Sequence, residues 1–130
     1  MIPKIQKILY ATDLSPNSAF AFRYAINFAT KHDSTIIILH VFESISTAVR
    51  AHMELYLDQE QRERIFNGQV AYTKDRIKKR LNKFSDTELA DAPKAGGLIE
   101  SIEVCEGFAA DSILEKASEL KCDTIVMGTH

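Results

Sequence analysis

The sequence predicts an α/β fold of the doubly wound type, with a mainly parallel sheet and helices on both of its faces. Short apolar runs typical of buried strands alternate with segments of helical periodicity, in the order β α β α β α β. Right-handed crossovers between the strands favour the doubly wound arrangement. Because 130 residues suffice for one core and are too few for two ordinary domains, we expect a single domain over residues 1–130.

The first part of the chain predicts two strands joined by a helix. Residues 7–12, KILYAT, are a short apolar run bounded by turn residues. Ser15 can cap the following helix and Pro16 is tolerated in its first turn; we expect this helix to end near residues 31–33. Residues 35–42, TIIILHVF, predict a strand covered on both faces. The predicted apolar stripe of the helix consists of Ala19, Phe22, Ile26 and Ala29.

The middle of the chain predicts a long helix and a third strand. Residues 43–55 have no dependable periodicity, so we expect an excursion that is part loop and part helix. Residues 57–84 predict a long, highly charged helix, and residues 92–97 predict a turn-rich connection to a strand over residues 98–105. The predicted apolar stripe of the long helix consists of Phe66, Val70, Thr73, Ile77, Leu81 and Phe84.

The last part of the chain predicts one more helix and a fourth strand. Gly107 precedes a helix whose first turn contains Asp111, a favourable position for an acidic residue. Residues 121–123 end this helix, and residues 124–127 predict the fourth strand. The predicted buried stripe of the helix consists of Ile113, Leu114, Ala117 and Leu120.

The composition excludes several classes of protein. A formal net charge of -2 gives no overall field that favours nucleic acid, so we expect no nucleic-acid partner. The longest apolar stretch, residues 36–42, is far shorter than the roughly 20 residues of a membrane helix. The N-terminus has no signal-peptide pattern, so we expect a soluble cytoplasmic protein without membrane insertion. Cys105 and Cys122 lie in or beside apolar segments and have no metal-binding or redox spacing, which favours a core role.

Two residues that follow predicted strands can together form a ligand site. In open α/β sheets, ligands bind beyond the carboxyl ends of the strands, where successive connections run in opposite directions. With a strand order of 3-2-1-4 this point lies between the first and fourth strands, which Asp13 and Gly128 directly follow. A carboxylate there can accept hydrogen bonds from ribose hydroxyls, and a glycine lets backbone N–H groups approach a phosphate. Val41, at the end of the second strand, can offer main-chain groups to a base.

Each of these residues also has a structural interpretation. Asp13 can satisfy loop amides before the first helix, and Gly128 can simply belong to a turn. His130 can be a surface residue, and His40, inside the second strand, is expected to be buried and hydrogen-bonded. The residue pattern alone leaves both interpretations open.

The sequence resembles the universal stress protein family over essentially all of its 130 residues, and three stretches carry the resemblance. KILYATDLSPNS resembles the first strand and loop of the family, IIILHVFE its second strand, and EGFAADSILEKASELKCDTIVMGTH its third helix and fourth strand. Residues 125–130, IVMGTH, are the most specific part. Ala109 stands where the family often has a proline. The resemblance implies a flavodoxin-like sheet, a homodimer and, in one branch of the family, binding of ATP, ADP or AMP.

The resemblance also implies which residues bind the nucleotide. Asp13 matches the family's carboxylate near the ribose and adenine, and Val41 matches the strand end that contacts adenine. Met127 and Gly128 match the start of the phosphate motif. The implied nucleotide-binding set is Ala11, Thr12, Asp13, Val41, Met127, Gly128, Thr129 and His130.

The chain departs from the family at its phosphate motif. That motif has the form glycine, two residues, glycine, nine residues, glycine and then serine or threonine, and only its first glycine is present here. The family's last helix and fifth strand are missing as well. Either the 130 residues are part of a longer polypeptide or the protein ends at His130. We expect the first, because a chain ending at the fourth strand would leave a hydrophobic sheet edge open to aggregation.

The leading function is therefore a stress-response or signalling module that binds an adenine nucleotide without designed turnover, with Mg²⁺ able to bridge the phosphates. The alternative is a structural or dimerisation module of the same family that binds no nucleotide, which the incomplete glycine motif favours. We do not expect an enzyme, because the four histidines have no metal-ligand spacing and no pattern identifies a catalytic base. The sequence leaves open whether a bound ATP is slowly hydrolysed.

Overall fold

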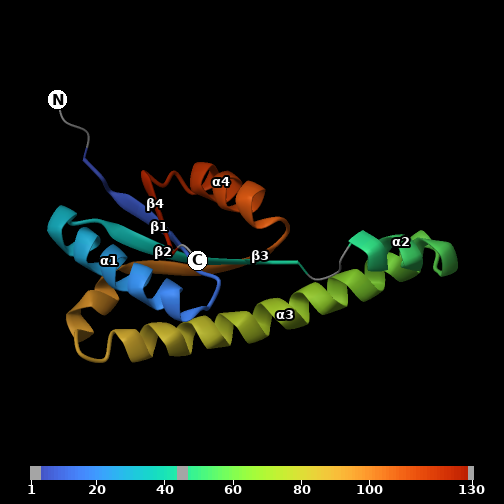
Figure 1. Cartoon of the computed structure of the whole chain (residues 1–130), viewed down its shortest axis with the longest axis horizontal. Helices are drawn as coiled ribbons and strands as arrows, with labels where there is room; N and C mark the ends of the chain where they lie inside the picture. The colour runs from blue at the N-terminus through green and yellow to red at the C-terminus, as the bar shows by residue number, and fades with distance from the viewer. Residues whose placement is uncertain (1–3, 44–46, 129–130) are drawn as a thin grey trace.

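The computed structural model describes residues 4–43 and 47–128, which build a four-stranded parallel sheet with helices on both faces (Figure 1). The predicted α/β fold class is confirmed, and so is the predicted strand order, because the sheet runs β3-β2-β1-β4. The strands are β1 (Lys7–Ala11), β2 (Thr35–Phe42), β3 (Ile99–Glu106) and β4 (Thr124–Met127).

Strand β1 lies in the interior of the sheet. It pairs in parallel with β2, where Leu9 lies opposite Ile37, and with β4, where it lies opposite Ile125. Residues 8–10 are completely buried, as a run that is apolar on both faces requires. The connection after β1 leads to β2 on one side, whereas the chain later returns to β4 on the other side. The carboxyl end of β1 is therefore the switch point of the sheet.

Helix α1 (Pro16–His32) packs on one face of the sheet. The hydroxyl of Ser15 accepts a hydrogen bond from the Ser18 backbone N–H, and Asp33 ends the helix in the left-handed conformation. The predicted stripe was only partly right: Phe22 and Ala29 are buried, but Ala19 and Ile26 are half-buried. The fully packed face consists of Ser18, Ala21, Phe22, Ala25 and Ala29. Its small residues allow the helix to lie close to the sheet.

Helix α3 (Gln59–Glu88) lies on the same face as α1 but covers the sheet only with its C-terminal half (Figure 1). Ile77, Leu81 and Ser85 are buried there. The N-terminal half of α3 and helix α2 (Thr47–Tyr56) extend beyond the sheet, and we call α2 together with residues 59–72 the helical arm. The predicted stripe is correspondingly incomplete, because Phe66 and Val70 in the arm, and Thr73 directly after it, are only half-buried. The expected excursion over residues 43–55 contains α2, and residues 44–46 lie outside the described residues.

Helix α4 (Ala109–Glu119) covers the opposite face of the sheet (Figure 1). The predicted turn over residues 92–97 is a short 3₁₀ helix, η1 (Pro93–Leu98), which leads into β3. Because side chains alternate along each strand, the sheet separates two cores. Ile8, Tyr10, Ile36 and Ile38 face α1 and α3, and the other core consists of Leu9, Ile37, Leu39 and Ala117.

The two cysteines support their predicted core role. Cys105 and Cys122 are half-buried free thiols packed against the core beneath α4. Burial raises the pKa of both thiols above the ordinary value of 9.0, which disfavours the reactive thiolate. Within residues 4–43 and 47–128, no helix is both long and apolar enough to cross a membrane.

The packing of α3 predicts where substitutions destabilise the protein. Leu81 is completely buried, whereas the side chain of Leu55 on the helical arm is 76% exposed. Leu81→Ala leaves a cavity between α3 and the sheet and is expected to lower the free energy of unfolding by about 2–5 kcal/mol. Leu55→Ala is the control and is expected to change it by less than about 0.5 kcal/mol. Urea unfolding followed by circular dichroism measures both, and equal effects would contradict this account of the packing.

Candidate functional site

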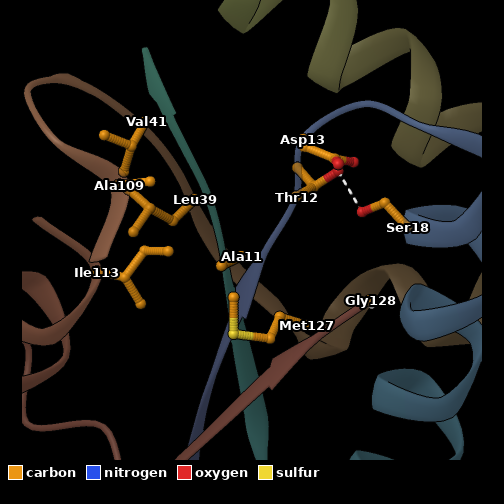
Figure 2. Close-up of a pocket in the computed structure, with 10 residues that line it drawn as sticks. All are labelled: Ala11, Thr12, Asp13, Ser18, Leu39, Val41, Ala109, Ile113, Met127 and Gly128. Atoms are coloured by element: carbon orange, nitrogen blue, oxygen red, sulfur yellow. Dashed lines mark hydrogen bonds between the residues drawn. The ribbon is translucent and has the colours of Figure 1, made fainter. Parts of the chain in front are cut away.

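A cavity of about 190 Å³ opens at the carboxyl ends of β1, β2 and β4 (Figure 2). It brings together six of the residues predicted to form the site, although they come from three separate parts of the chain. These are Ala11, Thr12, Asp13, Val41, Met127 and Gly128. The remaining two, Thr129 and His130, lie outside the described residues.

Four further residues line the cavity and were missed by the sequence reasoning: Ser18, Leu39, Ala109 and Ile113. Leu39 had a clear signal, because it precedes Val41 by two residues and therefore lies on the same face of β2. Ala109 and Ile113 lie one turn apart at the start of α4, at the sheet edge where ligands bind in such folds. Ser18 had a weaker signal, its place in the first turn after Asp13.

The cavity has an apolar side and a polar side (Figure 2). Val41 and Leu39 from β2 face Ala109 and Ile113 from α4 on the apolar side. Thr12, Asp13 and Ser18 lie on the polar side, as their sticks show. Ligand sites commonly combine apolar walls with a few polar groups that fix the orientation of the ligand. This cavity therefore suits a molecule that has both a flat apolar part and hydroxyl or charged groups.

A buried cluster of hydroxyl groups supports the polar side. Thr12 is only 6% exposed, and its Oγ1 accepts hydrogen bonds from the Ser18 hydroxyl and from the Leu14 backbone N–H at 3.0 Å. The Tyr10 hydroxyl, beneath Ser18, donates to the Ser18 carbonyl oxygen at 2.5 Å. These bonds hold Leu14 in the left-handed conformation, at φ 66°. The loop between β1 and α1 is therefore stabilised by hydrogen bonds within itself and to the first turn of α1.

Asp13 lies exposed at the rim of the cavity, and its Oδ1 accepts a hydrogen bond from the Ser15 backbone N–H at 2.9 Å. The structural interpretation of Asp13 as a loop-satisfying residue is therefore correct for this oxygen. A carboxylate offers about four acceptor sites, so this bond does not by itself exclude a ligand role.

Gly128 has a packing role that the sequence did not reveal. A Cβ atom at this position would lie 3.1 Å from the Asn17 carbonyl oxygen and 3.4 Å from the Ser18 Cα. The glycine thus lets the end of β4 approach the first turn of α1 closely.

The N-terminus of α4 also reaches the cavity, at Ala109, and no side chain caps that helix. The positive ends of two helix dipoles therefore lie at the rim, which favours a negatively charged ligand.

The chain is an α/β domain with a parallel, doubly wound sheet and a cavity at its switch point, the place where open α/β sheets commonly bind ligands. The sequence pattern of the universal stress protein family matches residues 4–130, and the chain belongs to that family. The resemblance seen in the sequence is therefore confirmed.

Solved structures support the same fold. The hypothetical protein MJ0577 is 20% identical, with a TM-score of 0.64 over 98% of this chain and 77% of its own. The universal stress protein UspA from Lactobacillus plantarum is 21% identical, with a TM-score of 0.57 over 99% of this chain and 82% of its own. A universal stress protein crystallised in complex with cAMP is 21% identical, with a TM-score of 0.56 over 95% of this chain and 71% of its own. No curated protein sequence matches this chain significantly.

The buried hydroxyl cluster predicts a loss of stability at alkaline pH. Burial raises the pKa of Tyr10 above its ordinary value of 10.0, although the hydrogen bond with Ser18 acts in the opposite direction. The unfolded chain thus releases this proton at lower pH than the folded protein does. The free energy of unfolding therefore falls as the pH rises from 10.0 through the raised pKa.

Tyr10→Phe is expected to reduce this fall, because the variant has no phenol at position 10 to ionise. Urea unfolding between about pH 9 and pH 11 measures the slope. Tyr72→Phe, at a ring that is 65% exposed, is the control and is expected to keep the wild-type slope. A Tyr10→Phe protein that keeps the wild-type slope would show that Tyr10 does not cause the alkaline loss.

Proposed function

We propose that this chain is a universal stress protein domain that binds an adenine nucleotide, ATP above all, as a stress-response or signalling module. One observation carries the proposal: six residues expected to bind the nucleotide, from three distant segments, line one cavity that has an apolar and a polar side. A fold relative crystallised in complex with cAMP supports an adenine nucleotide as the class of ligand.

The proposed pose places the adenine base between the strand wall at Val41 and the helix wall at Ile113. The ribose hydroxyls then reach Asp13, and the phosphates pass Gly128 toward the N-terminus of α1. A cavity of about 190 Å³ is smaller than the roughly 300–1,000 Å³ of sites that enclose a whole ligand. It therefore fits the base and part of the ribose, and the phosphates extend beyond it.

The charges at the site suit binding through backbone groups. Among the described residues that line the cavity, none is a lysine or arginine, so the helix ends supply the positive potential. The described part of the chain also has no group of three or more acidic, histidine or cysteine side chains that could hold a metal ion. We therefore propose that Mg²⁺ is held chiefly by the phosphate oxygens of ATP.

We propose binding without designed turnover. Asp13 is the one ionisable side chain among the described residues that line the cavity. A nucleophile needs an adjacent base, and a general base needs a position close to the attacking water. Slow hydrolysis of bound ATP is compatible with this site, but no described residue is arranged to promote it.

The second candidate is a structural or dimerisation module that binds no nucleotide. The hydrogen bond between Asp13 and the Ser15 backbone N–H favours it, because the carboxylate then has a role in the absence of a ligand.

For either function we propose a homodimer in the cytoplasm, as the family resemblance implies. Native mass spectrometry of the full-length protein reads the subunit number and any bound nucleotide together.

Substitutions at Asp13 separate the two candidates. Asp13→Ala removes the loop acceptor and the ligand acceptor, whereas Asp13→Asn keeps an oxygen for the Ser15 N–H and removes the charge. If Asp13 binds the ribose, both variants are expected to weaken ATP binding by about 10- to 100-fold in isothermal titration calorimetry. Asp91→Ala, at an exposed position after α3, is the control and is expected to keep wild-type affinity.

Wild-type affinity in both Asp13 variants would exclude the ribose role. Wild-type affinity in Asp13→Asn alone would limit Asp13 to shaping the loop. A full-length wild-type protein that binds no ATP would overturn the proposed function and favour the second candidate.

A further inference from the structure

The hydrogen-bond ladder between β1 and β2 ends at the cavity. Its last paired residues are Ala11 and Leu39, and its last backbone bond runs from the Thr12 N–H to the Leu39 carbonyl oxygen at 2.9 Å. Main-chain groups alternate in direction along a strand, so those of Val41 point toward the β1 side, as those of Leu39 do. The next bond of a parallel ladder would join the Val41 N–H to the Thr12 carbonyl oxygen. In the described structure Thr12 lies outside β1, and this bond is not formed.

The side chain of His40 occupies the position of the missing partner. Its Nδ1 lies 2.6 Å from the Thr12 carbonyl oxygen. A carbonyl oxygen only accepts hydrogen bonds, so Nδ1 carries the proton and donates it. The Thr12 carbonyl is thereby satisfied without the Val41 N–H, which is left beside the cavity that Val41 lines.

Further hydrogen bonds hold the Thr12 side chain. Its Oγ1 accepts from the Ser18 hydroxyl and from the Leu14 N–H, while its carbonyl accepts from His40. These contacts hold both the side chain and the carbonyl of Thr12, the residue that leads directly into Asp13. The direction of Asp13 at the rim therefore depends on His40, although His40 does not itself line the cavity.

We propose that His40 is a positioning residue for the ligand. It diverts the Thr12 carbonyl from the β1–β2 ladder, keeps the Val41 N–H available to an acceptor atom of a purine-type base, and orients the peptide before Asp13. This inference rests on the proposed nucleotide site. Without the imidazole, the Thr12 carbonyl turns to the Val41 N–H, the ladder closes by one step, and the cavity loses a donor.

The first test compares ATP binding in variants of the full-length protein. His40→Leu removes the ring donor, whereas His40→Asn keeps an amide nitrogen close to the position of Nδ1. We expect His40→Leu to weaken ATP binding about tenfold in isothermal titration calorimetry and His40→Asn to stay within about threefold of wild type. His52→Leu, on the exposed side of the helical arm, is the matched control and is expected to bind ATP like wild type. A His40→Leu protein that binds ATP like wild type would overturn the proposal.

The second test needs no nucleotide and measures whether the Val41 N–H is hydrogen-bonded in the β1–β2 ladder. Amide hydrogen exchange by NMR is expected to be fast at Val41 in the wild type and in His40→Asn, and at least about tenfold slower in His40→Leu. The same exchange rate in all three proteins overturns the inference. If the wild type binds no ATP, the proposed function fails, and this exchange result alone decides the role of His40.

A third measurement is independent of any variant that fails to fold. The ¹⁵N chemical shifts of the wild-type His40 ring report which nitrogen carries the proton. A protonated Nδ1 supports the assignment, and a neutral ring protonated only at Nε2 overturns it.

Discussion

The structure depends on a central strand that is hydrogen-bonded along both of its edges. Because β1 pairs with β2 and β4, its side chains are enclosed above and below by helices, and its residues 8–10 reach no solvent. Such a strand has only one place where its backbone meets a ligand, the end at which the chain must leave the sheet. The cavity forms there because β1 and β4 end level with each other, at Ala11 and Met127, while β2 continues to Phe42 and supplies one wall. The burial that stabilises the fold thus also determines the position of the site.

Close backbone approach is the second constraint on the site. The end of β4 touches the first turn of α1, and a Cβ at Gly128 would lie 3.1 Å from the Asn17 carbonyl oxygen, so a larger residue would push these two segments apart by a few tenths of an ångström. The contact brings the positive end of a helix of 17 residues to the rim. The packing role of Gly128 and its proposed role beside an anionic ligand therefore fall on the same residue.

Much of the fold could be predicted from the sequence because its strands are buried on both faces and give unbroken apolar runs. The predicted bounds of β2 and β4 are confirmed. Of the six predicted cavity residues, Asp13, Val41 and Gly128 were named from the strand ends, and the family resemblance added Ala11, Thr12 and Met127. The predicted buried faces of the helices were less accurate, and Leu114, expected in the buried stripe of α4, is 64% exposed. Ala19 and Ile26 were expected on the buried face of α1, but Ser18, Ala21 and Ala25 lie there, because small residues can face a closely packed sheet as well as large ones. His40 was expected to be buried and hydrogen-bonded; it is half-buried, and its partner, the Thr12 carbonyl 28 positions away, had no sequence signal.

Helix α3 makes the molecule mechanically uneven. Thirty residues of α-helix are about 45 Å long, and only the last part of this length is anchored to the sheet. The remainder is joined to the body through continuous helix and begins at a capping box between Asp58 and Gln61. Thermal bending of such a cantilever displaces its tip most and its root least. We therefore expect amide hydrogens near Ile77 to exchange with solvent only through global unfolding. Amide hydrogens near the tip are expected to exchange through local fraying, which leaves the sheet and its cavity intact.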